Sequence, residues 1–182
     1  QPRDVNGDGI VDAFYDAVLN VSWLADGRAA RGTAYETTEY PPGSGAATFA
    51  NALAWATALD LYGVSGWRLP RLIDTGAPGC QWAYVGTDCG YNVQTISSDG
   101  KTVYSELAHL YYLTLGNLGR YDAQGIDRAN AGSYGLVNTG SFVNFVSQPY
   151  WHVVANPPPN ADSAWVFVNA WGLQPDWDLS EW

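Results

Sequence analysis

The stretch Ala164-Trp165-Val166-Phe167-Val168-Asn169-Ala170-Trp171 is the strongest strand candidate in the chain, because β-branched and aromatic residues dominate it. Two shorter runs of the same kind precede it, at residues 141–146 and 150–154. The turn sequence Pro157-Pro158-Pro159-Asn160 stands between the second run and the candidate strand. Residues 13–24 are also rich in strand-forming residues. Strands are therefore expected at both ends of the chain.

Two helices are expected between these strand regions. The first is predicted from apolar residues at helical spacing, followed by Gly63, which can end a helix in the left-handed conformation; these residues are Ala52, Trp55, Ala56, Leu59 and Tyr62. The second is predicted over residues 105–116, before Gly116 and Gly119, with one face formed by Leu107, Leu110, Tyr111 and Thr114. The pattern predicts an α+β domain over residues 13–182, preceded by a polar arm at residues 1–12, with terminal strands that can pair.

Composition excludes some classes of function. The 182-residue chain carries a net charge of -10 and only eight Lys and Arg residues, too few to build a basic surface for nucleic acid. No apolar run approaches the roughly 18 residues of a membrane helix, so no transmembrane segment is expected. Nine Trp and twelve Tyr residues are unusual in one small domain. Such residues suit cores, but also interfaces and sugar-binding surfaces.

The two cysteines, Cys80 and Cys89, flank a short polar segment. A pair of this kind predicts a disulfide and an oxidising compartment. Zinc is a weaker alternative, because it needs four ligands and the two histidines, His109 and His152, lie far away in the sequence. The chain starts at Gln1 rather than Met, which is typical of a secreted product whose signal peptide has been removed.

Residues 4–12 have the ligand spacing of a calcium loop of the EF-hand or dockerin type. Side-chain oxygens, the carbonyl of residue 10 and the carboxylate of residue 12 would supply the ligands; these residues are Asp4, Asn6, Asp8, Ile10 and Asp12. Tyr15 stands where the bidentate acid of such loops is expected. The alternative is a polar turn that joins a tail to the first strand.

Several motifs in order resemble the DUF1566 family, also called the Lcl C-terminal domain family. The most specific is Gly66-Trp67-Arg68-Leu69-Pro70 after a helix, followed by Tyr150-Trp151 and Ala164-Trp165-Val166-Phe167-Val168. The opening Leu19-Asn20-Val21-Ser22-Trp23-Leu24 resembles the family's start, and the segments around both cysteines and residues 105–110 resemble a secreted bacterial subgroup.

The resemblance implies a fold similar to C-type lectins and formylglycine-generating enzymes. In that fold, two helices flank a small antiparallel sheet and the N- and C-terminal strands pair. It also implies an extracellular or cell-surface location, and a role in adhesion, glycan binding or assembly. The family's Tyr-Trp-Ser-Ser has become Tyr150-Trp151-His152-Val153 here. The calcium motifs of sugar-binding C-type lectins are missing, so sugar binding through calcium is not expected. Subgroup members often carry a C-terminal sorting signal, and the sequence stops at Trp182 before any such segment. Removal by processing and a longer natural chain are the two alternatives.

An enzyme is not expected. Both cysteines are predicted to lie in a disulfide, and His109 and His152 lie in apolar contexts typical of packed histidines. The family motif is interpreted as structural, at Trp67, Arg68, Leu69, Pro70, Tyr150 and Trp151.

The sequence therefore predicts a secreted, non-catalytic bacterial protein that assembles with copies of itself into a filament or matrix. The alternative is an adhesive module that binds extracellular polysaccharide. Core positions are expected for Trp23, Trp55 and Trp67, and interface or ligand-stacking positions for Trp165, Trp171, Trp177 and Trp182. Calcium is the one cofactor considered.

Overall fold

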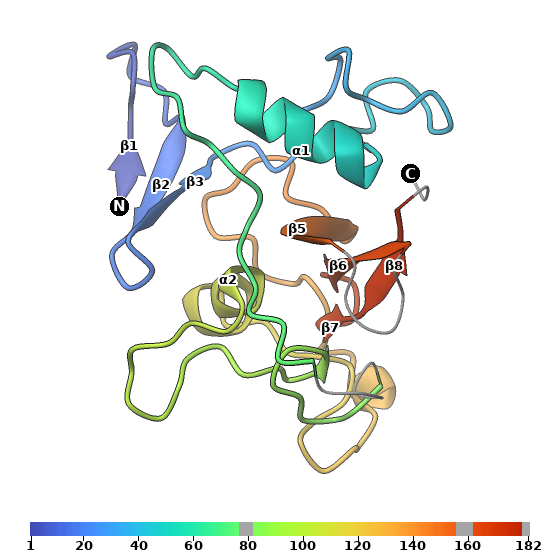
Figure 1. Ribbon diagram of the computed structural model, residues 1–182. Helices are drawn as coiled ribbons and strands as arrows, with labels where there is room; N and C mark the ends of the chain where they lie inside the picture. Colours follow the sequence, from blue (N-terminus) through green and yellow to red (C-terminus); the bar gives the residue numbers. More distant parts are fainter. Residues whose placement is uncertain (77–81, 156–161, 180–182) are drawn as a thin grey trace. The chain divides into compact units, whose positions relative to one another are not determined.

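The protein combines α and β elements, and its sheets are antiparallel (Figure 1), which confirms the mixed architecture predicted from the sequence. The structure, a computed structural model, describes residues 1–76, 82–155 and 162–179. The described residues form two compact units. The first comprises Gln1–Arg68 and Thr139–Phe145, and the second comprises the described parts of Leu69–Asn138 and Val146–Glu181.

The first unit begins with a three-stranded antiparallel sheet in the order β1-β2-β3. The strands are β1 (Pro2–Arg3), β2 (Ala13–Asp16) and β3 (Val21–Leu24). The predicted polar arm thus contributes a strand to this sheet. The expected pairing of N- and C-terminal strands stays a prediction. The hairpin between β2 and β3 spans only a few residues, and closing a short loop costs little entropy.

Helix α1 (Phe49–Ala58) follows in the same unit. Its first turn is capped by Thr48, whose hydroxyl oxygen accepts a hydrogen bond from the Asn51 N–H. The helix ends four residues earlier than the apolar spacing predicts. Asp60 accepts a hydrogen bond from the Gly63 N–H, and this local turn competes with further helix formation.

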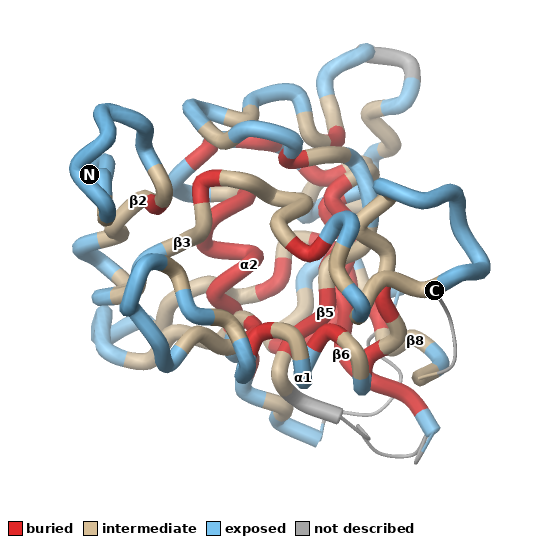
Figure 2. Tube along the Cα trace, turned by 90° about the horizontal axis from the view of Figure 1, so that it is seen from above, coloured by how far each residue is buried: buried red, intermediate tan, exposed pale blue. Residues whose placement is uncertain are grey.

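The second unit holds a five-stranded antiparallel sheet in the order β4-β7-β6-β5, with β8 also paired to β6. Its strands are β4 (Gly90–Tyr91), β5 (Pro149–Ala155), β6 (Ser163–Val168), β7 (Leu173–Gln174) and β8 (Asp176–Asp178). Every residue of β6 is buried (Figure 2). The predicted strand at 164–171 ends early because the chain turns at Gly172, which has a positive φ of 61°. The predicted strand at 141–146 forms only an isolated bridge, between Val143 and Asp26.

The predicted second helix is present but changes its geometry. It begins as α2 (Glu106–Ala108), capped by the Ser105 hydroxyl, and continues as the π-helix η1 (His109–Thr114). A short 3₁₀ helix, η2 (Arg128–Ala131), follows. The wider π turn rotates the helix face, so Tyr111 is buried while Thr114 is exposed. No helix in the described part of the chain is long and apolar enough to cross a membrane.

Buried polar side chains link the elements of the second unit. The Ser105 hydroxyl donates to the Gln174 side-chain oxygen at 2.7 Å, and the Gln174 amide donates to the Asp88 carbonyl at 2.6 Å. The Trp165 indole donates to Asp74 at 3.1 Å. Buried polar groups of this kind are tolerated because they have partners, and they fix the segments that surround β6.

Candidate functional site

The predicted calcium ligands lie in an exposed N-terminal loop. The carboxylates of Asp4, Asp8 and Asp12 accept hydrogen bonds of 2.7 or 2.8 Å from backbone N–H groups of the same loop. The donors are Val5, Gly7, Gly9 and Ile10. Asn6 joins the loop through Asp8. Across the described ranges, no group of three or more His, Cys, Asp or Glu side chains is placed to hold a metal ion. Calcium binding stays a prediction.

Cys89 is buried and disulfide-bonded. Its predicted partner, Cys80, lies outside the described residues, as do Trp182 and the turn at 157–160. A disulfide at this position stabilises a fold mainly by restricting the unfolded chain.

The tryptophans are placed differently from the prediction. Trp165 is 5% exposed and belongs to the core, so it cannot serve as an interface or stacking residue in this structure. Trp171 is exposed, and Trp177 in β8 is half-buried. The three tryptophans expected in the core are only half-buried; these are Trp23, Trp55 and Trp67.

The residues of the family motif take part in backbone hydrogen bonds or are buried. The Pro70 carbonyl accepts a hydrogen bond from the Val153 N–H at 2.8 Å. Tyr150 accepts one from the Val146 N–H at 3.2 Å. Leu69 and Trp151 are buried, while Arg68 is half-buried. The structural role of the motif stays a prediction.

Both histidines are buried. Burial lowers the pKa of His152 to about 4, while nearby Glu106 acts in the opposite direction. A buried imidazole with a lowered pKa is neutral at pH 7.

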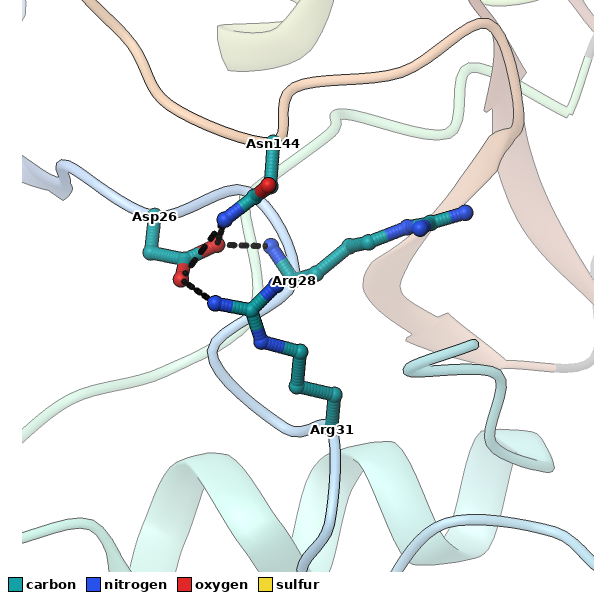
Figure 3. A network of polar contacts seen from close by, with 4 residues as sticks. All are labelled: Asp26, Arg28, Arg31 and Asn144. Atoms are coloured by element: carbon teal, nitrogen blue, oxygen red, sulfur yellow. Dashed lines mark hydrogen bonds and ion pairs between the residues drawn. The ribbon is translucent and has the colours of Figure 1, made fainter. Parts of the chain in front are cut away.

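A polar network in the first unit centres on Asp26 (Figure 3). Its carboxylate accepts hydrogen bonds from the Arg28 N–H at 2.8 Å and the Asn144 amide at 3.1 Å, and it pairs with the Arg31 guanidinium at 3.0 Å. Figure 3 shows the Arg28 guanidinium pointing away from this carboxylate. The network connects residues 139–145 to the loop after β3, and the Asp26 carboxylate is bonded to groups within the same unit. It is therefore interpreted as structural.

A cluster of aromatic rings in the second unit is the best candidate for a binding site. Three tyrosines, named here the tyrosine platform, contact one another in an edge-to-face pair and a tilted pair: Tyr91, Tyr121 and Tyr84. The ring centroids of Tyr91 and Tyr121 are 4.9 Å apart, and those of Tyr121 and Tyr84 are 5.2 Å apart. Tyr91 is buried, Tyr121 is half-buried and Tyr84 is exposed.

Asn92 fixes the two loops that carry the platform. Its side-chain amide donates to the carbonyls of Tyr84 and Tyr121, both at 2.9 Å. Its backbone has a positive φ of 47°, a conformation that asparagine tolerates better than most residues. Its N–H donates to the Tyr112 hydroxyl, which in turn donates to the Gly172 carbonyl. The backbone of the platform's two loops is thus held by hydrogen bonds to other segments of the second unit.

An ion pair borders the platform. The Arg120 guanidinium contacts the Asp127 carboxylate at 3.0 Å and lies 5.3 Å from the centre of the Tyr121 ring. The hydrogen bond to Asp127 raises the pKa of Arg120, and the same contact lowers the pKa of Asp127. Both side chains are about a third exposed, at 36% and 33%. The pair can therefore offer polar atoms to a ligand beside the aromatic faces.

The same loops also carry exposed apolar side chains. Trp82 is 63% exposed, and Val85 and Ile126 are also exposed. The sequence pattern does not predict this site, because its two loops are far apart in the chain and have no periodic pattern. The one feature that points to it is the pair Trp82 and Tyr84, two aromatic residues close together in a segment rich in turn residues.

No protein-family model, curated protein or solved structure matches this chain. The resemblance to the DUF1566 family therefore rests on the sequence motifs alone.

Proposed function

We propose that this protein is a non-catalytic extracellular module that binds glycans through the tyrosine platform and Trp82. The observation that carries the proposal is the exposed Tyr84 ring against the half-buried Tyr121 ring, on two loops joined by Asn92, beside a polar pair. A pyranose ring presents C–H bonds on its faces and hydroxyl groups at its edges. The electron-rich face of an aromatic ring packs against the C–H bonds, and carboxylate, guanidinium and amide groups form hydrogen bonds with the hydroxyl groups.

Rigidity of the platform supports a binding role. Tyr84 and Tyr121 are fastened to each other by one side chain, Asn92. Gly125 lies so close to the Tyr84 ring that a Cβ atom there would overlap it. A surface that is ordered before binding loses less conformational entropy when a ligand arrives. Exposed aromatic groups held in this way are typical of recognition surfaces.

An extracellular location is part of the proposal and is supported by the disulfide at Cys89, since disulfides persist in oxidising compartments. We also propose, from the motifs, that the fold is C-type-lectin-like and belongs to the DUF1566 family. The mixed architecture and antiparallel sheets agree with this at the coarse level.

Self-assembly, the function predicted first from the sequence, is the second candidate. It is favoured by the exposed apolar group Trp82, Val85 and Ile126, which another copy would cover. The two candidates use the same surface, and particle mass separates them. Light scattering of the purified protein detects polymers if assembly is the function and a constant monomer mass if it is not.

The binding proposal is tested by titrating the protein with a panel of soluble polysaccharides and following tryptophan fluorescence. Trp82→Ala and Tyr84→Ala are each expected to weaken binding at least about tenfold, the equivalent of about 1.4 kcal/mol. Tyr62→Asn is the matched control, because Tyr62 is 61% exposed, lies in the other unit and has a positive φ that asparagine tolerates. Failure of the unmodified protein to bind any polysaccharide would overturn the proposal, as would equal effects of all three substitutions.

A further inference from the structure

We infer that the tyrosine platform selects electrically neutral glycans over acidic ones, an inference that rests on the proposed glycan binding. It comes from the charges around the platform and from what each charge already contacts. These decide whether a ligand carboxylate or sulfate would find a free cation.

The loops of the platform carry no excess of positive charge. Arg120 and Arg128 are the cations, and Asp122 and Asp127 are the anions of residues 120–128, which sum to zero. Asp88 in the other loop adds one negative charge. The whole chain carries -10, so its long-range field repels a polyanion rather than attracting it.

Arg120 already has an anionic partner. Its Nε lies 3.3 Å from both Asp127 oxygens, and its Nη2 lies 3.0 Å from one of them. The Arg128 Nη1 donates to the Gly119 carbonyl, a neutral acceptor, at 2.8 Å. An anionic ligand that contacts Arg120 would lie beside the Asp127 carboxylate. The repulsion between the two anions would oppose binding.

A sugar hydroxyl meets no such obstacle, because it both donates and accepts. It can share the Asp127 carboxylate, which has about four acceptor positions and accepts from Arg120 and from the Ala129 N–H. It can accept from Arg120, whose bonds to Asp127 use Nε and Nη2 and leave the Nη1 hydrogens. The ion pair therefore suits vicinal hydroxyl groups next to a stacked ring.

The test compares two classes of probe by tryptophan fluorescence at low and high salt. Mannan, dextran and a soluble β-glucan are the neutral probes, and alginate, polygalacturonate and heparin are the acidic probes. We expect at least one neutral probe to bind at least tenfold more tightly than every acidic probe, with an affinity that changes less than twofold between 50 and 500 mM salt.

A substitution then tests the role of the ion pair. Asp127→Asn keeps a good helix-capping side chain for η2 but frees the Arg120 cation, and we expect it to strengthen acidic-probe binding several-fold. Glu39→Gln changes the net charge equally in the other unit and should have no such effect.

Tighter binding of the acidic probes by the unmodified protein overturns the inference but leaves glycan binding intact. No change in acidic-probe affinity for Asp127→Asn also counts against it. Binding of neither class overturns the proposed function and this inference together.

Discussion

Replacing His152 should make the stability of the protein less sensitive to acid. His152 lies in β5 and is fully buried. Burial is the main reason that its pKa falls from 6.5 to about 4; Glu106, Gln174 and the nearby backbone oppose the fall. The folded state thus favours the neutral imidazole.

The sign and size of the effect follow from proton linkage. Between pH 6.5 and pH 4 the unfolded chain binds a proton at this position and the folded chain does not. Stability is therefore full above pH 6.5 and is lost as the pH falls through this range. The loss reaches about 3 kcal/mol below pH 4 and is about 2 kcal/mol at pH 5.

The assay is urea unfolding at pH 7, 6 and 5, for the unmodified protein and for His152→Gln and His152→Leu. Both variants are expected to lose about 2 kcal/mol less than the unmodified protein between pH 7 and pH 5. Nuclear magnetic resonance of the imidazole in the unmodified protein provides a second measurement that needs no variant. The reasoning is refuted if all three proteins lose stability in parallel, or if the His152 ring titrates near pH 6.5.

Three further predictions concern other parts of the chain. Tyr112→Phe leaves the Gly172 carbonyl and the Asn92 N–H without their partner, so urea unfolding should show a loss of about 1–3 kcal/mol; an unchanged midpoint would count against this. Hydrogen bonds from three backbone N–H groups hold the pKa of Glu36 at about 2. Glu36→Gln should therefore speed amide hydrogen exchange in residues 32–45 at neutral pH. Unaltered exchange would show that the carboxylate does not order this loop. Calcium is expected to raise the melting temperature relative to a chelator if residues 4–12 bind it, and equal temperatures would contradict the calcium prediction.

Patterns that depend on neighbouring residues were the ones that the sequence could predict. The central strand β6 and the helix after Ser105 follow from apolar runs and a capping residue. The burial of Trp165 could also be predicted, because a continuous apolar run indicates a strand buried on both faces. The prediction that Trp165 lies at an interface did not take this run into account.

Features set by contacts distant in sequence could not be predicted. The tyrosine platform exists because one side chain, Asn92, joins two loops that share no pattern. The early end of α1 depends on a competing turn at Asp60, which the apolar spacing does not reveal. Trp23, Trp55 and Trp67 show that aromatic content alone does not locate a core, since tryptophan is often only partly covered.

The most direct test of the central claim is a heteronuclear magnetic resonance titration of the isotope-labelled protein with a neutral soluble polysaccharide. Glycan binding at the tyrosine platform predicts that the largest shift changes fall on the Trp82 indole and on the backbone amides of Tyr84, Asn92 and Tyr121. Shift changes confined to the first unit, or a spectrum that does not change at saturating polysaccharide, would contradict it.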